Sequence, residues 1–230
     1  MNLKEITNPL ESNFCVWDVE VIHGPDEVKE GWSNPEDMGL ASAVVYDYPT
    51  NRYYFFLHPN SLGRLINLLQ TRTCVGFNSV QFDSRVIQRN NREVVWWEGL
   101  WITRKLSRPS NLYVLNSLAH IDLLVEYVDT VYRPKDTTNW SSYQEILDRP
   151  EIHDGTFTLD ALCEATLGER KTGSGERAPK LYRDGRYDEL LEYNLQDVRL
   201  TKHLFEHILE YEEVTNRKGE RVKIQTGGLR

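Results

Sequence analysis

The first half of the chain consists of short, apolar, β-rich runs separated by polar turns. Runs of this length, rich in Val, Phe, Tyr and Trp, predict strands at residues 14–21, 40–48 and 52–57. The turn-like sequence Tyr-Pro-Thr-Asn joins the second run to the third. We therefore expect the three runs to form an antiparallel meander.

The rest of the chain alternates predicted strands with predicted helices. Strands are predicted at residues 73–77 and 120–125, and helices at residues 61–70, 83–89, 158–167 and 188–211. Thr158 is the expected N-cap of one helix, and Gly168 is its expected end. This order of elements predicts an α/β fold with a mixed central β-sheet flanked by α-helices.

Two segments interrupt this pattern. The first, residues 96–111, combines the aromatic side chains of Trp96, Trp97 and Trp101 with the basic side chains of Arg104, Lys105 and Arg108. The second, residues 169–186, is rich in Gly, Lys and Arg and lacks periodicity, which predicts a loop. After the last helix, the sequence Asn-Arg-Lys-Gly-Glu-Arg predicts a hairpin over residues 213–224.

The composition is that of a globular protein. The 230 residues, 40% apolar and 27% charged, suit a single domain. No apolar run approaches the ~18 residues of a membrane span, and the first residues lack the apolar core of a secretory signal. Three widely separated cysteines match neither a zinc site nor a disulfide framework, so we expect a cytoplasmic protein without membrane contact.

The charge is acidic, with a formal net value of −8. Phosphate binding favours basic surfaces, so this value argues mildly against a nucleic-acid partner. Carboxylates that hold metal cations would account for part of it, however, and the distribution of charge is more informative than the sum.

The first candidate chemical group is the pair Asp18 and Glu20, in the sequence Val-Trp-Asp-Val-Glu-Val. Side chains two residues apart on a strand point to the same face, so the two carboxylates lie side by side. Adjacent carboxylates repel each other unless a cation lies between them. The alternative is a solvated strand face.

The second candidate is Asp83, which follows a buried strand and a short loop and opens the next predicted helix. At this position a carboxylate either caps the helix or contributes to a site at the end of the strand. The sequence leaves both interpretations open.

The third candidate is Asp197, in the middle of the predicted helix at residues 188–211. At ~100° per residue, Asp197 lies on the apolar arc, in line with Leu190 and Ile208. Burial of a charge there is costly unless it is paired or binds a metal. Tyr193 lies one turn earlier on the same face. By contrast, His203 and His207 fall on the polar arc, so we interpret them as surface residues and not as a zinc pair.

Taken in order, these motifs resemble those of the DEDD superfamily of exonucleases, which share the ribonuclease H-like (DnaQ-like) fold. The three motifs, D-x-E, N-x-x-x-F-D and Y-x-x-x-D, are matched by Asp18 and Glu20, by Asn78, Phe82 and Asp83, and by Tyr193 and Asp197. A sister branch has His five residues before the last Asp. This chain has Glu192 there, so it resembles the tyrosine (DEDDy) branch.

The resemblance covers roughly residues 14–209 and is similar to the proofreading domains of family-B DNA polymerases and to related stand-alone predicted exonucleases. It implies one ribonuclease H-like domain over residues 1–230. Residues near 92–118 and 129–156 find no counterpart and are expected to be insertions.

The activity that the resemblance implies is metal-dependent 3′→5′ exonuclease cleavage of DNA or RNA. Two Mg²⁺ or Mn²⁺ ions per site would be held by the oxygens of Asp18, Glu20, Asp83 and Asp197. Tyr193 would orient the attacking water, since a phenol with a pKa near ~10 is a poor base at neutral pH.

The expected partner is nucleic acid, as a single-stranded 3′ end, together with a possible separate polymerase or other replication or repair protein. Five residues are expected to bind the strand: Asn78, Phe82, Lys171, Lys180 and Arg183. Trp96, Trp97 and Arg104 are further candidates, with ordinary core packing as the alternative. The alternatives for the whole chain are a catalytically inactive nucleic-acid- or protein-binding module and an endonuclease or transposase on the same fold.

Overall fold

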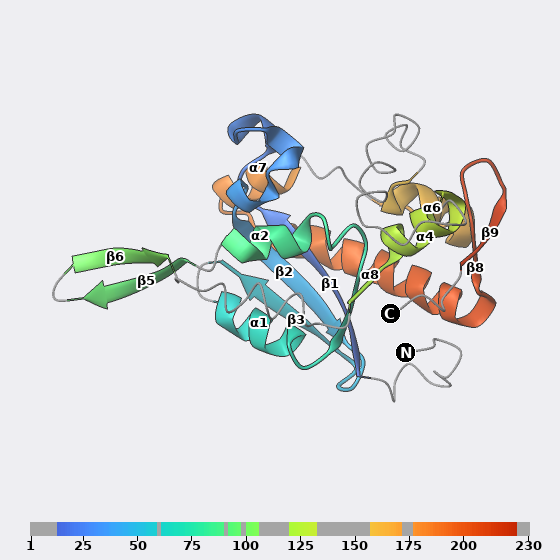
Figure 1. Ribbon diagram of the computed structural model, residues 1–230, viewed down its shortest axis with the longest axis horizontal. Helices are drawn as coiled ribbons and strands as arrows, with labels where there is room; N and C mark the ends of the chain where they lie inside the picture. The colour runs from blue at the N-terminus through green and yellow to red at the C-terminus, as the bar shows by residue number, and fades with distance from the viewer. Residues whose placement is uncertain are drawn as a thin grey trace.

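The computed structural model describes residues 13–58, 61–89, 92–97, 100–105, 120–132, 157–171 and 177–224. Its centre is a five-stranded sheet in the order β3-β2-β1-β4-β7 (Figure 1). The strands are β1 (Phe14–Val21), β2 (Leu40–Asp47), β3 (Arg52–Leu57), β4 (Thr73–Gly76) and β7 (His120–Asp122). The first three are antiparallel neighbours, whereas β4 and β7 run parallel to β1. The sheet is mixed, as the sequence predicts, and with its flanking helices it fits a ribonuclease H-like fold.

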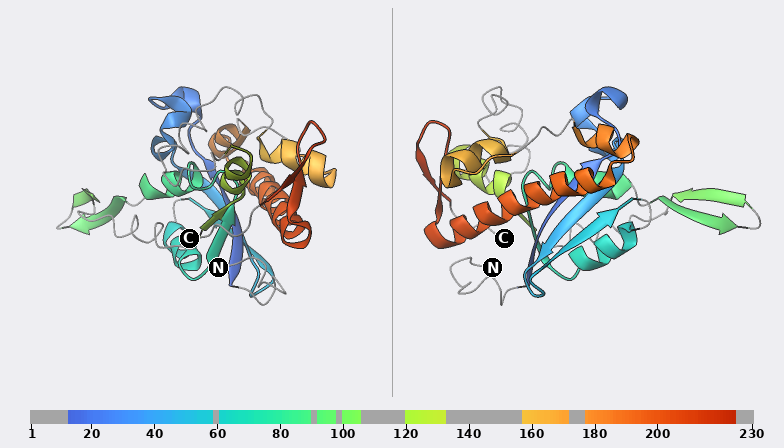
Figure 2. Two further views of the ribbon diagram at one scale, coloured as in Figure 1. Left: turned by 45° about the vertical axis from the view of Figure 1, so that its right-hand side comes forward. Right: turned by 180° about the vertical axis from the view of Figure 1, so that it is seen from behind.

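Helices cover both faces of this sheet (Figures 1 and 2). One face carries α1 (Leu62–Leu69) and α2 (Asp83–Arg89), and the other carries the long helix α8 (Tyr187–Tyr211). Successive side chains of β1 point to opposite faces of the sheet and so contribute to the hydrophobic core on each face. Trp17 and Val19 pack with the α1 and α2 side, while Phe14 and Val16 pack with the α8 side. Each face of β1 is therefore fixed by its own layer of helices.

The long helix α8 buries the arc that its sequence predicts. Leu190, Tyr193, Leu204 and Ile208 are buried, and so is the carboxylate of Asp197. The residues of the polar arc, including His203 and His207, are exposed or only partly buried. Two helices pack on α8, namely α6 (Leu159–Leu167) and α7 (Arg177–Arg183). Thr158 caps α6 by accepting a hydrogen bond from the Ala161 N–H, and Gly168 ends it at φ 72°.

Two sequence predictions are wrong, one about where a strand ends and the other about a segment that contains a helix. The predicted strand at residues 120–125 ends at Asp122, where α4 (Leu123–Tyr132) begins. The reason is local, because the Asp122 carboxylate accepts the N–H groups of Leu124 and Val125 and so starts a helix. The predicted loop at residues 169–186 contains α7, since Ala178 and Leu181 are buried in tertiary contacts with α8.

Two small antiparallel pairs lie outside the main sheet. One is β5 (Arg92–Trp97) with β6 (Leu100–Lys105), which projects from the body in Figure 1. The other is β8 (Glu213–Thr215) with β9 (Arg221–Lys223) after α8. Most of the expected insertion at residues 129–156 lies outside the described residues. Among the described residues, no helix is long and apolar enough to cross a membrane.

Candidate metal centre

Asp18 and Glu20 lie on β1, on the face that α8 covers. β4 pairs with β1 only along Phe14–Val16, so beyond Val16 this edge of β1 is free to meet other groups. The Val19 N–H donates there to Asp83 Oδ1 at 2.8 Å. A carboxylate from the start of α2 therefore takes a hydrogen bond from the strand between Asp18 and Glu20.

Three carboxylates converge between β1 and α8. One oxygen of each of Asp18, Glu20 and Asp197 lies within 4.8 Å of the others. Glu20 and Asp197 are 7% and 4% exposed, and Asp18 is half-buried. The packing of α8 on the sheet thus brings a carboxylate from near the end of the chain to two carboxylates from near its start. This group could hold a metal ion.

Asp83 lies beside this group and is 2% exposed. Its hydrogen bond to Val19 fixes it against the same stretch of strand, and its charge raises the pKa of both Asp18 and Glu20. The structure therefore places all four sequence-predicted carboxylates around residues 18–20. Asp83 approaches from the α2 side and the other three lie on the α8 side.

Lys171 supplies the positive charge of the site. Its ammonium donates to Asp197 Oδ2 at 2.6 Å and is largely buried. The Lys171 N–H donates to Asp160 Oδ1 at 2.7 Å, and Gln196 donates to the carbonyl of Arg170 at 3.2 Å. This short segment is therefore fixed between α6 and α8 with its ammonium directed to the carboxylates. The sequence predicts Lys171 as a strand-binding residue but does not predict this contact.

The site favours protonated carboxyls when no cation is bound. Burial raises the pKa of Asp18 well above its usual value, and repulsion from Asp83, Asp197 and Glu20 adds to the effect. Burial likewise raises the pKa of Glu20, and it raises that of Asp83 to about 7. Burial tends to lower the pKa of Lys171, but the surrounding carboxylates raise it overall.

Asn194 is a site residue that the sequence motifs do not single out. Its side-chain N–H₂ donates to Asp18 Oδ2 at 2.6 Å, and the residue is fully buried. The available signal is helical spacing, since Asn194 precedes Asp197 by three residues and shares its face. A buried amide on that face needs a partner, and Asp18 provides one.

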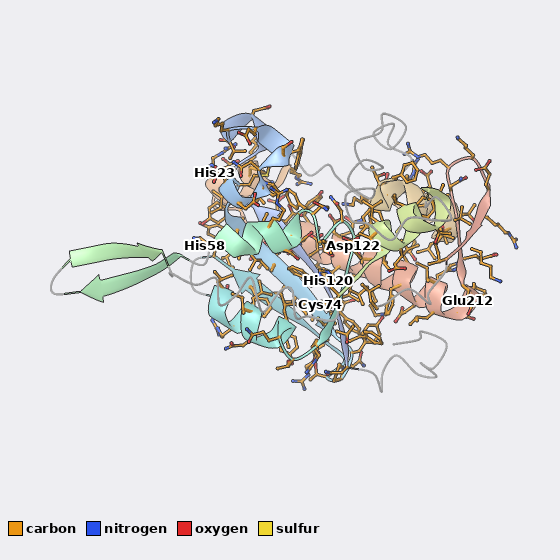
Figure 3. All side chains as sticks on the ribbon, viewed as in Figure 1. His23, His58, Cys74, His120, Asp122 and Glu212 are labelled. Atoms are coloured by element: carbon orange, nitrogen blue, oxygen red, sulfur yellow. The ribbon has the colours of Figure 1, made fainter. Side chains whose placement is uncertain are left out.

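Asp122 is a second residue that the sequence motifs do not single out. It holds the loop that carries the N-x-x-x-F-D motif of Asn78, Phe82 and Asp83. Its carboxylate accepts the N–H groups of Asn78 at 2.8 Å and Val80 at 2.9 Å. Burial raises the pKa of Asp122 to about 6, although these hydrogen bonds oppose the shift. Figure 3 labels Asp122 and His120, the last and first residues of β7. A hydrogen bond of 2.8 Å joins His120 Nε2 to the Ser79 hydroxyl. The loop is therefore held by both Asp122 and His120 of β7.

Among the expected strand-binding residues, Asn78 and Phe82 flank Asp83. Asn78 adopts a left-handed φ of 59°, and both side chains are half-buried. On α7, Lys180 is exposed, whereas the guanidinium of Arg183 forms an ion pair with Glu27. The strands β5 and β6 contain the further candidates Trp96, Trp97 and Arg104, whose side chains lie outside the described part of the structure.

The donor chemistry of the site fits a hard divalent cation. Within the described residues, buried Tyr193 Oη, Asn194 Oδ1 and Asp197 Oδ1 have no hydrogen-bond partner in the protein. Buried polar atoms of this kind are normally satisfied, so each is available to water or a ligand. The ligand atoms that the four carboxylates offer are all oxygens, the ligand type that Mg²⁺ and Mn²⁺ prefer.

The fold and the site together define an α/β protein with a ribonuclease H-like sheet and an acidic cluster between β1 and α8. Searches with protein-family models and against curated proteins find no match. Among solved structures, the chain is similar to the family B DNA polymerase from the hyperthermophilic archaeon Pyrobaculum calidifontis, with 18% identity and a TM-score of 0.49. The match covers 85% of this chain and 24% of that polymerase, so the chain spans about a quarter of its length.

Proposed function

We propose that this protein is a metal-dependent 3′→5′ exonuclease that hydrolyses phosphodiester bonds in DNA or RNA. The observation that carries the proposal is the convergence of oxygen ligands from Asp18, Glu20 and Asp197 within 4.8 Å of one another, with Glu20 and Asp197 buried. A purely structural role is a poor explanation, because three carboxylates around a single ammonium destabilise each other. The order of the three motifs adds the direction of digestion.

The carboxylates of Asp18, Glu20 and Asp197 would hold divalent cations, and Asp83 would assist from the α2 side. When bound, two Mg²⁺ or Mn²⁺ ions supply charge neutralisation at the phosphate and lower the pKa of water. Asn194 is a positioning residue in this scheme. Its 2.6 Å hydrogen bond holds one oxygen of Asp18, and the carboxylate held in this way would bind the cation.

Tyr193 is proposed to orient the attacking water. Burial raises the pKa of its phenol further above the ordinary value of 10.0, and the nearby carboxylates add to this shift. The hydroxyl therefore remains protonated at neutral pH and cannot act as the general base. It is buried and unpaired within the described structure, so it can both donate to water and accept from it.

Lys171 is proposed to contact the phosphate as well as Asp197. Its ammonium has three donors, and the structure uses one of them in the 2.6 Å contact with Asp197. The negative phosphate would enter beside this charge. Exposed Lys180 on α7 adds a second cation, and Asn78 and Phe82 border the position of the terminal nucleotide. Hydrolysis would then release a nucleoside 5′-monophosphate and leave a new 3′-hydroxyl. A proofreading role would need a separate polymerase partner.

The test is digestion of 5′-labelled single-stranded and duplex DNA and RNA with Mg²⁺, with Mn²⁺ and with EDTA. We expect a ladder of products shortened from the 3′ end, absent with EDTA and absent in Asp18→Asn. Glu210→Gln, on the exposed face of the same helix α8, is the matched control and should keep full activity. Binding without hydrolysis in every metal would instead identify an inactive binding module, and internal cuts would identify an endonuclease.

A further inference from the structure

Trp32 is an exposed aromatic residue that the site described so far does not use. Its side chain is 58% exposed, the largest exposed fraction among the large apolar side chains that the structure describes. It lies on the short 3₁₀ helix η4 (Gly31–Ser33), within the connection between β1 and β2. Exposure of an indole on this scale is unfavourable in water, so a binding role would account for it.

Trp32 contacts the middle motif directly. Its ring centroid lies 5.9 Å from that of Phe82, with the two planes tilted by 52°. Phe82 immediately precedes Asp83, whose carboxylate accepts the Val19 N–H beside the metal ligands. Half-buried Phe82 therefore adjoins a proposed catalytic residue, and solvent-exposed Trp32 contacts Phe82.

The backbone that carries Trp32 is held in place by the same helix that begins with Asp83. Arg85 on α2 donates to both carboxylate oxygens of Glu36, at 2.6 and 2.9 Å, and to the carbonyl of Ser33 at 3.0 Å. Bidentate guanidinium–carboxylate contacts fix orientation as well as distance. The position of Trp32 is thus coupled to that of Asp83 through Arg85.

The connection between β1 and β2 also forms an ion pair with α7. Glu27, on η3 (Pro25–Glu27), pairs with Arg183 of α7, and α7 packs on β1. In Figures 1 and 2 this connection and α7 lie side by side at the same end of the sheet, and Figure 3 marks the connection with His23. The segment that carries Trp32 therefore contacts both α2 and α7, and α7 also carries exposed Lys180.

We propose that Trp32 and Phe82 form a stacking subsite for an unpaired base near the 3′ end of the substrate. The proposal rests on the exonuclease function above and adds the residue, Trp32, that would select the single-stranded ends expected from the sequence. Every nucleobase has a π-face, so stacking on an aromatic side chain is tolerant of sequence. A base that is paired and stacked in a duplex cannot reach Trp32, so frayed or single-stranded ends are selected.

The test compares Asp18→Asn with the double variant Asp18→Asn/Trp32→Ala. Fluorescence anisotropy measures the affinity of each protein for a single-stranded oligonucleotide in the presence of Mn²⁺. Loss of base stacking should raise the Kd by about five- to hundredfold, and Trp32→Phe should restore most of the affinity. The matched control is Tyr211→Ala. Tyr211 is also 57% exposed but lies at the end of α8, on the order of 20 Å along the helix from Asp197. Its loss should leave the Kd unchanged.

A second measurement replaces single bases near the 3′ end by abasic residues, one position at a time. At the position that stacks on Trp32, the abasic residue should weaken binding to the parent protein, and Trp32→Ala should then cause no further loss. An equal effect of Trp32→Ala on every abasic substrate would overturn the proposal. An unchanged Kd of Trp32→Ala for unmodified DNA would also overturn the proposal, and would favour a protein partner as the ligand of Trp32.

These outcomes are distinct from failure of the proposed function. If wild type digests 3′ ends but Trp32→Ala binds like its parent, only the stacking subsite is refuted. If wild type digests nothing in any metal, the exonuclease proposal is refuted, while base-dependent binding at Trp32 is still measured by anisotropy. Melting temperatures of the variants check that each is folded.

Discussion

Replacement of Asp83 by Asn should stabilise the metal-free protein at pH 8. Burial and neighbouring carboxylates raise the pKa of Asp83 from its ordinary value of 3.8 to about 7. A raised carboxyl pKa stabilises the fold at low pH, and this contribution is lost as the pH rises through 7. Asn retains an oxygen that can accept the 2.8 Å hydrogen bond from Val19 but carries no charge.

The magnitude follows from the pKa shift. A shift of about 3 units at ~1.4 kcal/mol per unit corresponds to about 4 kcal/mol of unfavourable ionisation at pH 8. Neighbouring carboxyls that still hold protons share the repulsion, so we expect Asp83→Asn to gain about 2–4 kcal/mol. For a chain of this size that corresponds to a melting temperature roughly 5–15 °C above wild type. At pH 5 the folded-state carboxyl is uncharged but the unfolded-state carboxyl is still ionised, so the difference should fall to about 1–2 kcal/mol.

The assay is thermal unfolding of both proteins in EDTA at pH 5 and pH 8, repeated at pH 8 with excess Mn²⁺. Metal should stabilise wild type more than the variant, because a ligand at 100 times its Kd adds about 2.7 kcal/mol to the folded state. Asp47→Asn is the contrasting control. Asp47 is fully buried and paired with Arg72, so its loss should destabilise the protein in every condition.

Asp83→Asn should also abolish digestion of 3′ ends. If the variant instead melts well below wild type at pH 8 in EDTA, the charge of Asp83 is a structural partner. The repulsion on which the metal site is argued would then be wrong.

Three further variants test the other groups of the site. Lys171→Gln should lower the melting temperature in EDTA and enlarge the stabilisation by Mn²⁺, because the ammonium is the cation that neutralises Asp197 in the metal-free protein; an unchanged metal response would remove Lys171 from the site. Tyr193→Phe should lower kcat by roughly 10²-fold with little change in KM or stability, since its hydroxyl has no partner within the described structure, and an unchanged kcat would contradict its role. Asn194→Ala should weaken Mn²⁺ binding about 10–100-fold in calorimetry by releasing Asp18, and wild-type affinity would show that this hydrogen bond does not position the ligand.

The sequence by itself determined most of the elements and the residue types of the site. Strand periodicity placed Asp18 and Glu20 on one face, and helical periodicity placed Asp197 on the buried arc of α8. Both inferences hold because side-chain direction within a single strand or helix is set by local backbone geometry. The antiparallel pairing of β2 with β3 followed from the short turn between them for the same reason.

Only the tertiary structure decided what meets at the site. The contact of Lys171 with Asp197 and that of Asn194 with Asp18 join residues from separate elements, and no local pattern encodes the distance between them. The helix α7 was missed because its few buried residues gain their stability from α8 and β2, not from periodicity. The end of β7 was missed because Asp122 accepts hydrogen bonds from two segments at once. Local geometry thus fixed which way each carboxylate points, whereas the packing of α8 and α2 on the sheet fixed their common position, since that packing depends on contacts between residues distant in sequence.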